Sequence, residues 1–415
     1  MMISSPAPDP RPAYHFCTYF DRNYLTRGLA LYHSLRTHCR RPFFLWTLCF
    51  DDETYSILSR LDLADMRLIR RQDFEAGDAE LADARANRNA VEYFWTCTPS
   101  LPLYILRQDE AIHVITYLDA DLFFYSDPQP IFDEFGDRSI LIHGHRYAPE
   151  FAHFADTSGF YNVGLLSFRR DTHGLECLKW WRERCNEWCY TRFEAGKFGD
   201  QKYLDDWPVR FAGVAVLQHP GAGVAPWNIT LHPPKFQEGY ISVDDQPLIF
   251  YHFHGLRCVT NRLVSPATST YLYTITPQQL QHLHHPYVAM LRDISSLTGL
   301  GFQDRFALAD AAESPMVALL SQQCFLASPA RISTGLWRYA AERRIALASL
   351  AKADLSISKN EKMGARRQLL RSLFDHPLLI CEPGFLVLAT KALLSDRQIG
   401  GYRKVRDWLK ARLPT

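Results

Sequence analysis

Residues 117–125 read YLDADLFFY and contain the most informative motif of the chain. It places two carboxylates, Asp119 and Asp121, at the end of an apolar run that begins near His113. Alternate side chains of a strand share one face, so both carboxylates are predicted to point the same way while Ala120 points away. Acidic side chains at the point where a chain leaves a sheet are well placed to hold a divalent cation through oxygen ligands. The stretch therefore predicts a strand that delivers a metal site.

A metal at this position could grip a diphosphate and neutralise it as it leaves, which is the chemistry of a nucleotide-sugar transferase. Two acidic residues one position apart also occur in surface turns, and an isolated pair is most often of that kind. The strongly apolar flanks of Asp119 and Asp121 favour a functional site over a surface turn. The pair therefore points to an enzyme that handles a nucleoside diphosphate.

The composition allows a large globular enzyme and excludes several other classes of protein. The chain has 415 residues, of which 47% are hydrophobic and 13% aromatic, enough for one large domain and a smaller one. Its formal net charge of +1 gives no global field that favours nucleic acid. No apolar run reaches the roughly 18 residues that an ordinary membrane span requires. The 10 cysteines are scattered, which favours free thiols in a reducing cytoplasm and hence a cytoplasmic protein.

The start of the chain has the order strand, helix, strand, which predicts a parallel sheet with crossover helices. The strands are expected at 13–19 and 42–50, with an amphipathic helix over 25–35 between them. Ligands of such sheets bind outside the carboxyl ends of the strands. The end of the first strand carries the candidates for contact with a nucleotide's base and ribose, which are Tyr19, Asp21 and Asn23.

The rest of the chain divides into a region with further strands and a region without them. The further strands are expected at 112–118, 139–143, 159–168 and 248–254. We predict a disordered lead-in over residues 1–12, a catalytic domain over 13–275 and a helical C-terminal region over 276–415. Basic residues outnumber acidic ones after Arg331. This is either an ordinary solvated helix face or a surface for peripheral contact with an anionic lipid leaflet at the inner membrane face.

Six motifs in a fixed order make the chain from Tyr14 to Gly255 similar to the GT-A nucleotide-sugar transferases, and in particular to the retaining glycosyltransferase family 8. The motifs are an opening strand and helix at 16–35, YLDAD at 117–121, FYNVG at 160–164, Asp200-Gln201, Trp227-Asn228 and HFHG at 252–255. The resemblance implies a GT-A fold, which is a Rossmann-like mixed α/β sheet with flanking helices. The C-terminal region would be an α-helical extension of that fold.

The resemblance also implies a metal site. Asp119 and Asp121 would bind Mn²⁺ or Mg²⁺ together with His252, since imidazole and carboxylate ligands suit such a metal. A histidine in an apolar strand is more often a satisfied core residue, but the place of His252 at a strand end, three residues before Gly255, favours a ligand. His254 would share a face with His252 if the strand continues, so either histidine can be the ligand.

At the reaction centre the resemblance implies three residues, which are Asn162, Asp200 and Gln201. Asn162 stands in an otherwise apolar run, so it is either a satisfied structural amide or a contact to the donor sugar or acceptor. Asp200 would lie beside the anomeric carbon, and it could also cap the helix that follows it.

The chain departs from the family at the diphosphate clamp. Family members usually follow their His-x-x-Gly element with Lys-Pro-Trp, whereas residues 256–259 here read LRCV. Arg257 could supply the missing positive charge, Gly255 would let the backbone approach the diphosphate, and Asp119 would also lie near the ribose. The sequence is therefore a divergent relative, whose donor is not inherited from any one member.

The predicted function is transfer of a sugar from a nucleotide-diphosphate donor, expected to be a UDP-sugar, with retention of anomeric configuration. The acceptor would be a glycan, a lipid-linked precursor of polysaccharide biosynthesis, or a protein. Retention could arise through a glycosyl-enzyme on Asp200 or through same-face attack, in which the leaving phosphate takes the acceptor's proton.

Two other functions compete with this one. A haloacid-dehalogenase-type phosphatase would use Asp119 as nucleophile and Asp121 as acid/base, but its motif normally lies near the first strand, and here more than a hundred residues precede it. The same fold could also persist as a catalytically weak or inactive binding or scaffold subunit. The joint presence of the metal-site and reaction-centre residues argues against such decay.

Overall fold

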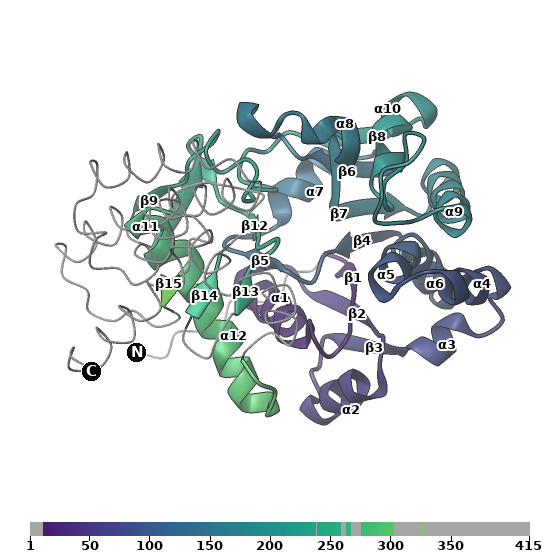
Figure 1. The fold of residues 1–415 in the computed structure, drawn as a ribbon, viewed down its shortest axis with the longest axis horizontal. Coiled ribbons are helices and arrows are strands. Elements are labelled where there is room, and N and C mark those ends of the chain that lie inside the picture. The colour runs from purple at the N-terminus through teal and green to yellow at the C-terminus, as the bar shows by residue number, and fades with distance from the viewer. Residues whose placement is uncertain (1–10, 238, 259–262, 267–274, 303–324, 327–415) are drawn as a thin grey trace, which may run out of the picture. The chain divides into compact units, whose positions relative to one another are not determined.

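The computed structural model describes residues 11–237, 239–258, 263–266, 275–302 and 325–326, which Figure 1 draws as ribbon. The chain forms two compact units, one of residues 1–256 and 270–305 and the other of residues 257–269 and 306–415. The described part of the second unit is an antiparallel sheet of β13 (Arg257–Cys258), β14 (Leu263–Ser265) and β15 (Phe325–Leu326). Most of the predicted lead-in over 1–12 and of the predicted helical region over 276–415 lies outside the described residues.

The first unit is built on a seven-stranded sheet in the order β3-β2-β1-β4-β7-β6-β8. The strands are β1 (Tyr14–Phe20), β2 (Phe43–Cys49), β3 (Met66–Arg70), β4 (Val114–Leu118), β6 (Ile140–Gly144), β7 (Tyr161–Arg169) and β8 (Val214–Leu217). Strands β1 to β4 are mutually parallel, whereas β7 is antiparallel to both β4 and β6. This mixed α/β sheet with flanking helices confirms the predicted fold class and is consistent with a GT-A fold. The parallel sheet predicted from the start of the chain is present in β1 to β4. The antiparallel strand β7 makes the whole sheet mixed.

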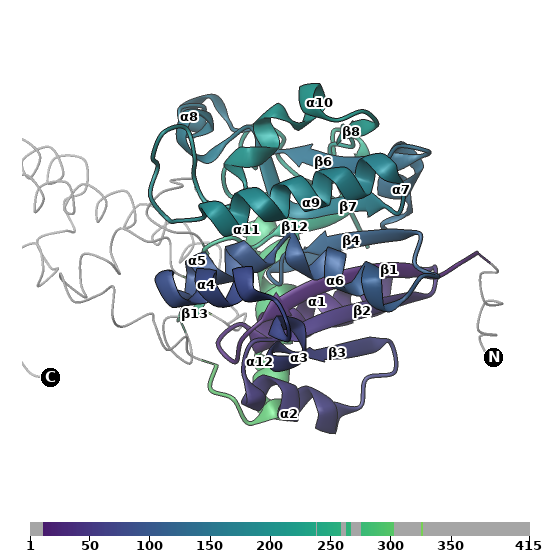
Figure 2. The same ribbon diagram turned by 90° about the vertical axis from the view of Figure 1, so that its right-hand side faces the viewer.

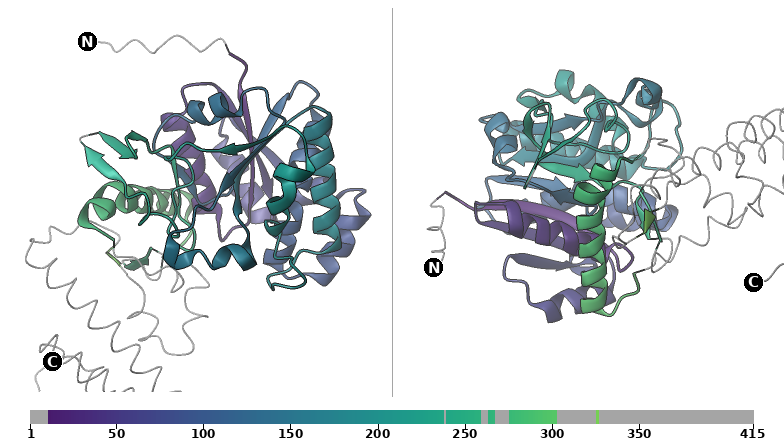
Figure 3. Two further views of the ribbon diagram at one scale, coloured as in Figure 1. Left: turned by 90° about the horizontal axis from the view of Figure 1, so that it is seen from above. Right: turned by 90° about the vertical axis from the view of Figure 1, so that its left-hand side faces the viewer.

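Helices cover both faces of this sheet (Figures 1 and 2). One face carries α4 (Ala79–Asn87), α5 (Ala90–Cys97), α6 (Ser100–Gln108) and α9 (Thr172–Glu187). The other carries α1 (Leu25–His38), which packs against α12 (His285–Thr298), as the right-hand view of Figure 3 shows. The remaining described helices are α2 (Asp52–Leu61), α3 (Arg71–Glu75), α7 (Gln129–Phe135), α8 (Phe154–Ser158), α10 (Trp207–Arg210), α11 (Pro277–Gln279), η1 (Pro149–Phe151), η2 (Lys202–Asp206) and η3 (Leu280–His284).

Two small sheets complete the first unit. Strand β5 (Leu122–Phe124) pairs antiparallel with β12 (Phe250–His252), directly after the acidic pair. Strands β9 (Lys235–Gln237), β10 (Tyr240–Val243) and β11 (Gln246–Pro247) form an antiparallel sheet further along the chain. No described helix combines the length and the apolar character needed to cross a bilayer.

Large aromatic side chains fill the core between the sheet and α9. Trp181, Trp207 and Phe168 are fully buried there, and the two indole rings meet edge to face at 5.2 Å. Burying each of these rings removes a large apolar area from water, so the cluster is a main source of stability. Helix α9 begins where the Asp171 carboxylate accepts a hydrogen bond from the Gly174 N–H at 2.8 Å. These contacts hold α9 against the sheet.

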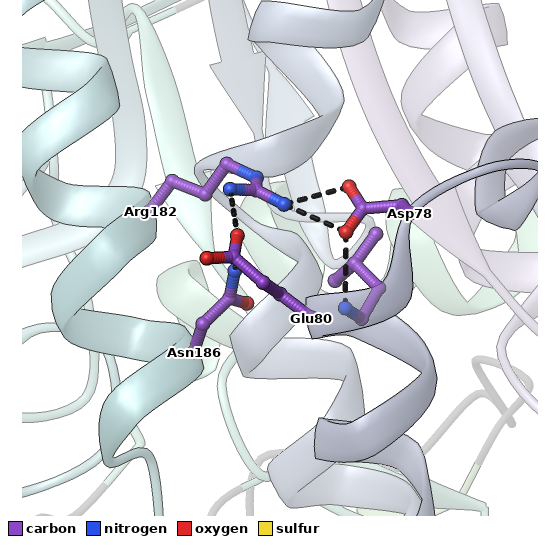
Figure 4. Close-up of polar contacts among 5 residues, drawn as sticks. Asp78, Glu80, Arg182 and Asn186 are labelled. Atoms are coloured by element: carbon purple, nitrogen blue, oxygen red, sulfur yellow. Dashed lines mark hydrogen bonds and ion pairs between the residues drawn. The ribbon is translucent and has the colours of Figure 1, made fainter.

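Helices α4 and α9 are joined by polar contacts around Arg182 (Figure 4). The Arg182 guanidinium donates to both carboxylate oxygens of Asp78, each at 2.7 Å, and also pairs with Glu80. Asp78 additionally caps α4, because its carboxylate accepts from the Leu81 N–H at 3.0 Å. Asn186 donates to Glu80 from the same face of α9. Asp78 therefore performs two stabilising roles at once, whereas Glu80 is more than half exposed.

We expect Asp78→Ala to lower the free energy of unfolding by about 1–2 kcal/mol, because it removes both a helix cap and a bidentate ion pair. Glu80→Ala is the matched control, and its exposed pair should contribute less than about 1 kcal/mol. Urea denaturation of both variants measures the difference. Equal losses in the two variants would contradict the double role of Asp78.

Candidate active site

The acidic pair lies in a turn at the end of β4. Strand β4 ends at Leu118, and residues 119–121 turn the chain into β5. The predicted end of the strand at Leu118 agrees with the structure, and a turn orients the two carboxylates, which both face His252. The Asp119 N–H donates to the Gly164 carbonyl at 2.9 Å, and the Asp121 carbonyl accepts from the Phe253 N–H at 3.0 Å. The turn is thus held by β7 on one side and by the segment after β12 on the other.

His252 lies between the two carboxylates. Its Nε2 atom is 3.1 Å from Asp121 Oδ1 and 3.6 Å from Asp119 Oδ2. The antiparallel pairing of β5 with β12 causes this contact, because it sets His252 opposite Leu122, the residue after Asp121. Burial alone would lower the pKa of His252, but the two carboxylates raise it above its usual value. Burial raises the pKa of Asp121 and the adjacent His252 lowers it, so that the net pKa is below the usual value.

Three side chains form a group that fits a divalent metal. One ligand atom each of Asp121, His252 and His254 lie within 4.8 Å of one another. Among the described residues, the buried Nδ1 atom of His252 has no hydrogen-bond partner. Imidazole nitrogen with carboxylate oxygen is a donor set that Mn²⁺ accepts readily. Asp119 Oδ2 faces the same His252 nitrogen, while Asp119 Oδ1 accepts from the Tyr117 hydroxyl at 2.8 Å.

The predicted reaction-centre residues line a cleft of about 380 Å³. Its lining includes seven of the residues singled out from the sequence, which are Tyr19, Asp119, Asn162, Asp200, Gln201, His252 and His254. They come from the ends of β1, β4, β7 and β12 and from the segment before η2. The fold therefore brings together segments that are up to 235 residues apart in the chain, between positions 19 and 254.

Asp200 is buried at the wall of this cleft. Its carbonyl accepts from the Trp181 indole N–H at 2.8 Å, so the core of α9 positions its backbone. Gly199 precedes it with φ of 53°, and a Cβ atom at Gly199 would lie 3.0 Å from the Trp95 ring. Burial and the charge of Asp119 raise the pKa of the Asp200 carboxyl, hydrogen bonding by Thr98 lowers it, and the net value is about 7. A carboxyl group with a perturbed pKa in a cleft is typical of an active site.

The Asn162 amide is held on both sides. Its Oδ1 atom accepts from the Gly164 N–H at 2.8 Å, and its Nδ2 atom lies 3.1 Å from His145 Nε2. A Cβ atom at Gly164 would lie 2.6 Å from that Oδ1 atom and 3.1 Å from His252 Nδ1. Only glycine fits at position 164, and Asn162 therefore packs closely beside the metal-site histidine.

The remaining predicted residues lie outside the cleft lining, and these are Asp21, Asn23, Asp121, Gly255 and Arg257. The Asp21 carboxylate accepts from the backbone N–H groups of Asn23 and Tyr24 and from the Asn23 side-chain amide, so Asp21 and Asn23 form a local turn before α1. Gly255 has a φ of 72°, which favours glycine at that point. Arg257 belongs to the second unit, in β13.

Several cleft residues were not predicted from the sequence. They are aromatic or imidazole side chains, which are Trp95, His145, Tyr147, Phe154, Phe198 and Trp227. Trp227 stood in one of the six motifs without a role, and its ring contacts those of His252 and His254 at 5.3 and 5.5 Å. The others gave no signal, because a single aromatic residue in a sequence is most often part of a core.

A hydroxyl group also links the cleft to the protein interior. The Tyr19 hydroxyl and the buried Thr98 hydroxyl are 2.9 Å apart. The Tyr19 ring packs against Tyr117 with centroids 5.5 Å apart. Tyr19 therefore lines the cleft together with Asp119 and Asp200.

Comparison with known proteins identifies relatives of this chain. No family model matches it. It is 33% identical over 251 residues to the uncharacterized protein YfnD of Bacillus subtilis, which covers 60% of this chain and 80% of YfnD. It is 36% identical over 253 residues to the uncharacterized protein YfnF of the same organism, which covers 59% of this chain and 82% of YfnF. The chain belongs to the family of YfnD and YfnF.

The solved structures that this chain resembles include glycosyltransferases. The galactosyltransferase LgtC, in complex with donor and acceptor sugar analogues, has a TM-score of 0.43 and 13% identity, covering 67% of this chain and 95% of LgtC. Mouse xyloside xylosyltransferase 1 has a TM-score of 0.38 and 14% identity, and the match covers 59% of this chain and 98% of the mouse protein. The glycosyltransferase GlyE of Streptococcus pneumoniae has a TM-score of 0.40 and 14% identity, and the match covers 71% of this chain and 66% of GlyE. These are likenesses of fold.

Proposed function

We propose that the protein is a metal-dependent glycosyltransferase that uses a nucleotide-diphosphate sugar, with a UDP-sugar as the expected donor, and retains anomeric configuration. The observation that carries the proposal is the meeting of two groups at one cleft. Asp121, His252 and His254 offer ligand atoms for a divalent cation, and the two histidines line the cleft. Asn162, Asp200 and Gln201 line the same cleft. A transferase needs both, because the leaving diphosphate and the sugar are parts of one molecule.

The metal-site residues would bind Mn²⁺ or Mg²⁺, through Asp119, Asp121 and one or both of His252 and His254. A bound cation would supply neutralisation of the diphosphate charge as the donor bond breaks. Burial of Asp121 and His252 supports this role, since charges in a dry site act more strongly than charges in water.

The remaining residues would orient the donor. Asn162 and Gln201 would hold the sugar with Asp200 beside its anomeric carbon. Tyr19, Asp21 and Asn23 would contact the base and ribose, and Gly255 and Arg257 the diphosphate. Asp200 could be the nucleophile of a glycosyl-enzyme or could stabilise the sugar during same-face attack.

The acceptor would be a glycan, a lipid-linked precursor or a protein. The basic composition after Arg331 supports peripheral contact with the inner membrane face, in a cytoplasmic protein with a helical C-terminal region. Deletion of the residues after Arg331 tests this, and unchanged membrane association would contradict it.

Donor hydrolysis across a panel of nucleotide sugars tests the proposed function. We expect metal-dependent release of nucleotide from one donor, in the presence of Mn²⁺ or Mg²⁺ and not of EDTA, because water can replace the acceptor slowly. The readout is free nucleotide by chromatography. If no donor on the panel released nucleotide and calorimetry showed no metal-dependent donor binding, a non-catalytic binding subunit would be favoured.

A further inference from the structure

His145 contacts Asn162 in a way that assigns the hydrogen-bonding direction of both side chains. The Gly164 N–H is a donor, so the Asn162 atom that it meets at 2.8 Å must be the amide oxygen. The amide nitrogen therefore faces His145 Nε2 at 3.1 Å. An amide nitrogen has hydrogens and no free acceptor site, so His145 Nε2 must accept and must carry no proton.

The backbone around His145 is held from several directions. The His145 carbonyl accepts from the Trp227 indole and from the Asn228 side-chain amide, each at 2.8 Å. The His145 N–H donates to the Phe160 carbonyl at 2.9 Å. The next residue, Arg146, has a φ of 50°, an uncommon conformation outside glycine.

The surroundings of the His145 ring oppose its protonation and its rotation. The ring stacks on that of Tyr147 with centroids 4.6 Å apart and planes 8° from parallel. Burial lowers the pKa of His145 to about 3, and the neighbouring His252 contributes in the same direction. A neutral ring with a bare Nε2 atom carries its proton on Nδ1. Strain in the backbone and stacking of the ring are the kind of constraint that holds a side chain at a functional site.

We infer that His145 is a positioning residue that orients the Asn162 amide in the cleft, an inference that rests on the proposed function. Asn162 has two N–H bonds, of which His145 takes one, while its oxygen faces the backbone of its own strand. The other N–H is left to donate to an oxygen of the molecule in the cleft. Asn162 would therefore recognise a hydroxyl or ring oxygen of the donor sugar as an acceptor of a hydrogen bond. Neither side chain would need to change its conformation when the sugar binds.

The first test is the tautomer of His145 in the full-length protein, and it requires no activity. Nitrogen-15 spectra of histidine-labelled protein at pH 8 report which ring nitrogen carries the proton, and the His145 signals are those lost in His145→Gln. We expect the proton on Nδ1 in the natural protein. We expect it to move at least partly to Nε2 in Asn162→Leu. A proton on Nε2 in the natural protein would overturn the inference, because Asn162 could not then donate to that atom.

The second test separates positioning from a merely structural role. His145→Gln keeps a side-chain oxygen that can accept from Asn162, whereas His145→Leu keeps a similar bulk without an acceptor. We expect kcat of donor turnover to fall by about 100-fold in His145→Leu, with KM nearly unchanged, and to be largely restored in His145→Gln. Equal losses in both variants, with unchanged melting temperatures, would overturn the inference. Absence of turnover in the natural protein would contradict the proposed function and would leave the tautomer result to decide on His145.

Discussion

Asp121→Asn is expected to abolish metal-dependent donor turnover, with a loss of about 10²–10³-fold or more, the size of effect seen when one charge-stabilising group is removed. The carboxylate is buried and lies 3.1 Å from His252 Nε2, within the group that offers three ligand atoms. Asparagine keeps the shape of the side chain but removes the negative charge that strengthens the binding of a divalent cation. Calorimetric titration with Mn²⁺ and nucleotide release by chromatography measure the two consequences separately.

Asp127→Asn is the matched control for this variant. Asp127 follows β5 in the same segment of chain, and its carboxylate lies 3.8 Å from the exposed Arg40. Asp127 is not a member of the ligand group of Asp121, His252 and His254. We expect unchanged metal affinity and turnover in the control. An Asp121→Asn protein that kept its metal-dependent turnover while remaining folded would remove Asp121 from the metal site.

Asp200→Asn is expected to abolish turnover and, at the same time, to stabilise the metal-free protein at alkaline pH. Burial raises the pKa of the Asp200 carboxyl to about 7, from a usual value of 3.8. Ionisation of Asp200 is therefore harder in the folded protein than in the unfolded chain. Below about pH 4 the carboxyl is neutral in both states, so its ionisation costs the fold nothing. As the pH rises to 7, only the unfolded chain gains from ionisation, and the folded protein loses stability.

The asparagine variant does not titrate, so the difference in unfolding free energy should grow from pH 4 to pH 8. A pKa change of this size corresponds to at most about 4 kcal/mol. Urea denaturation in EDTA at several pH values measures the difference between the two proteins, in which the titrating groups that do not interact with Asp200 cancel. Most substitutions of a buried residue lower the free energy of unfolding. Here the inactive variant would have the higher free energy of unfolding. A difference that does not change with pH would show that Asp200 is not held in an unfavourable charged form.

Local features of the chain were sufficient for much of the fold. The apolar run before Asp119 predicted β4, and the start of the chain predicted β1, α1 and β2 within a few residues. These features could be predicted because strand and helix periodicity depends on neighbouring residues. The carboxyl ends of strands meet at one edge of a sheet, so the placement of Tyr19 near Asp119 also follows from the order of elements.

The contacts that complete the candidate site depend on strand pairings between distant segments. His252 reaches Asp121 because β12 pairs with β5, and His145 reaches Asn162 because β6 pairs with the antiparallel β7. A shift of one residue in either register would turn the side chain to the other face, and no local pattern specifies that register. The pKa of Asp200 likewise depends on burial and on a hydrogen bond from Thr98, which precedes it by 102 residues. The order and type of the elements thus follow from the local sequence. The contacts of His145 and His252 and the raised pKa of the Asp200 carboxyl arise only when the strands are paired and water is excluded.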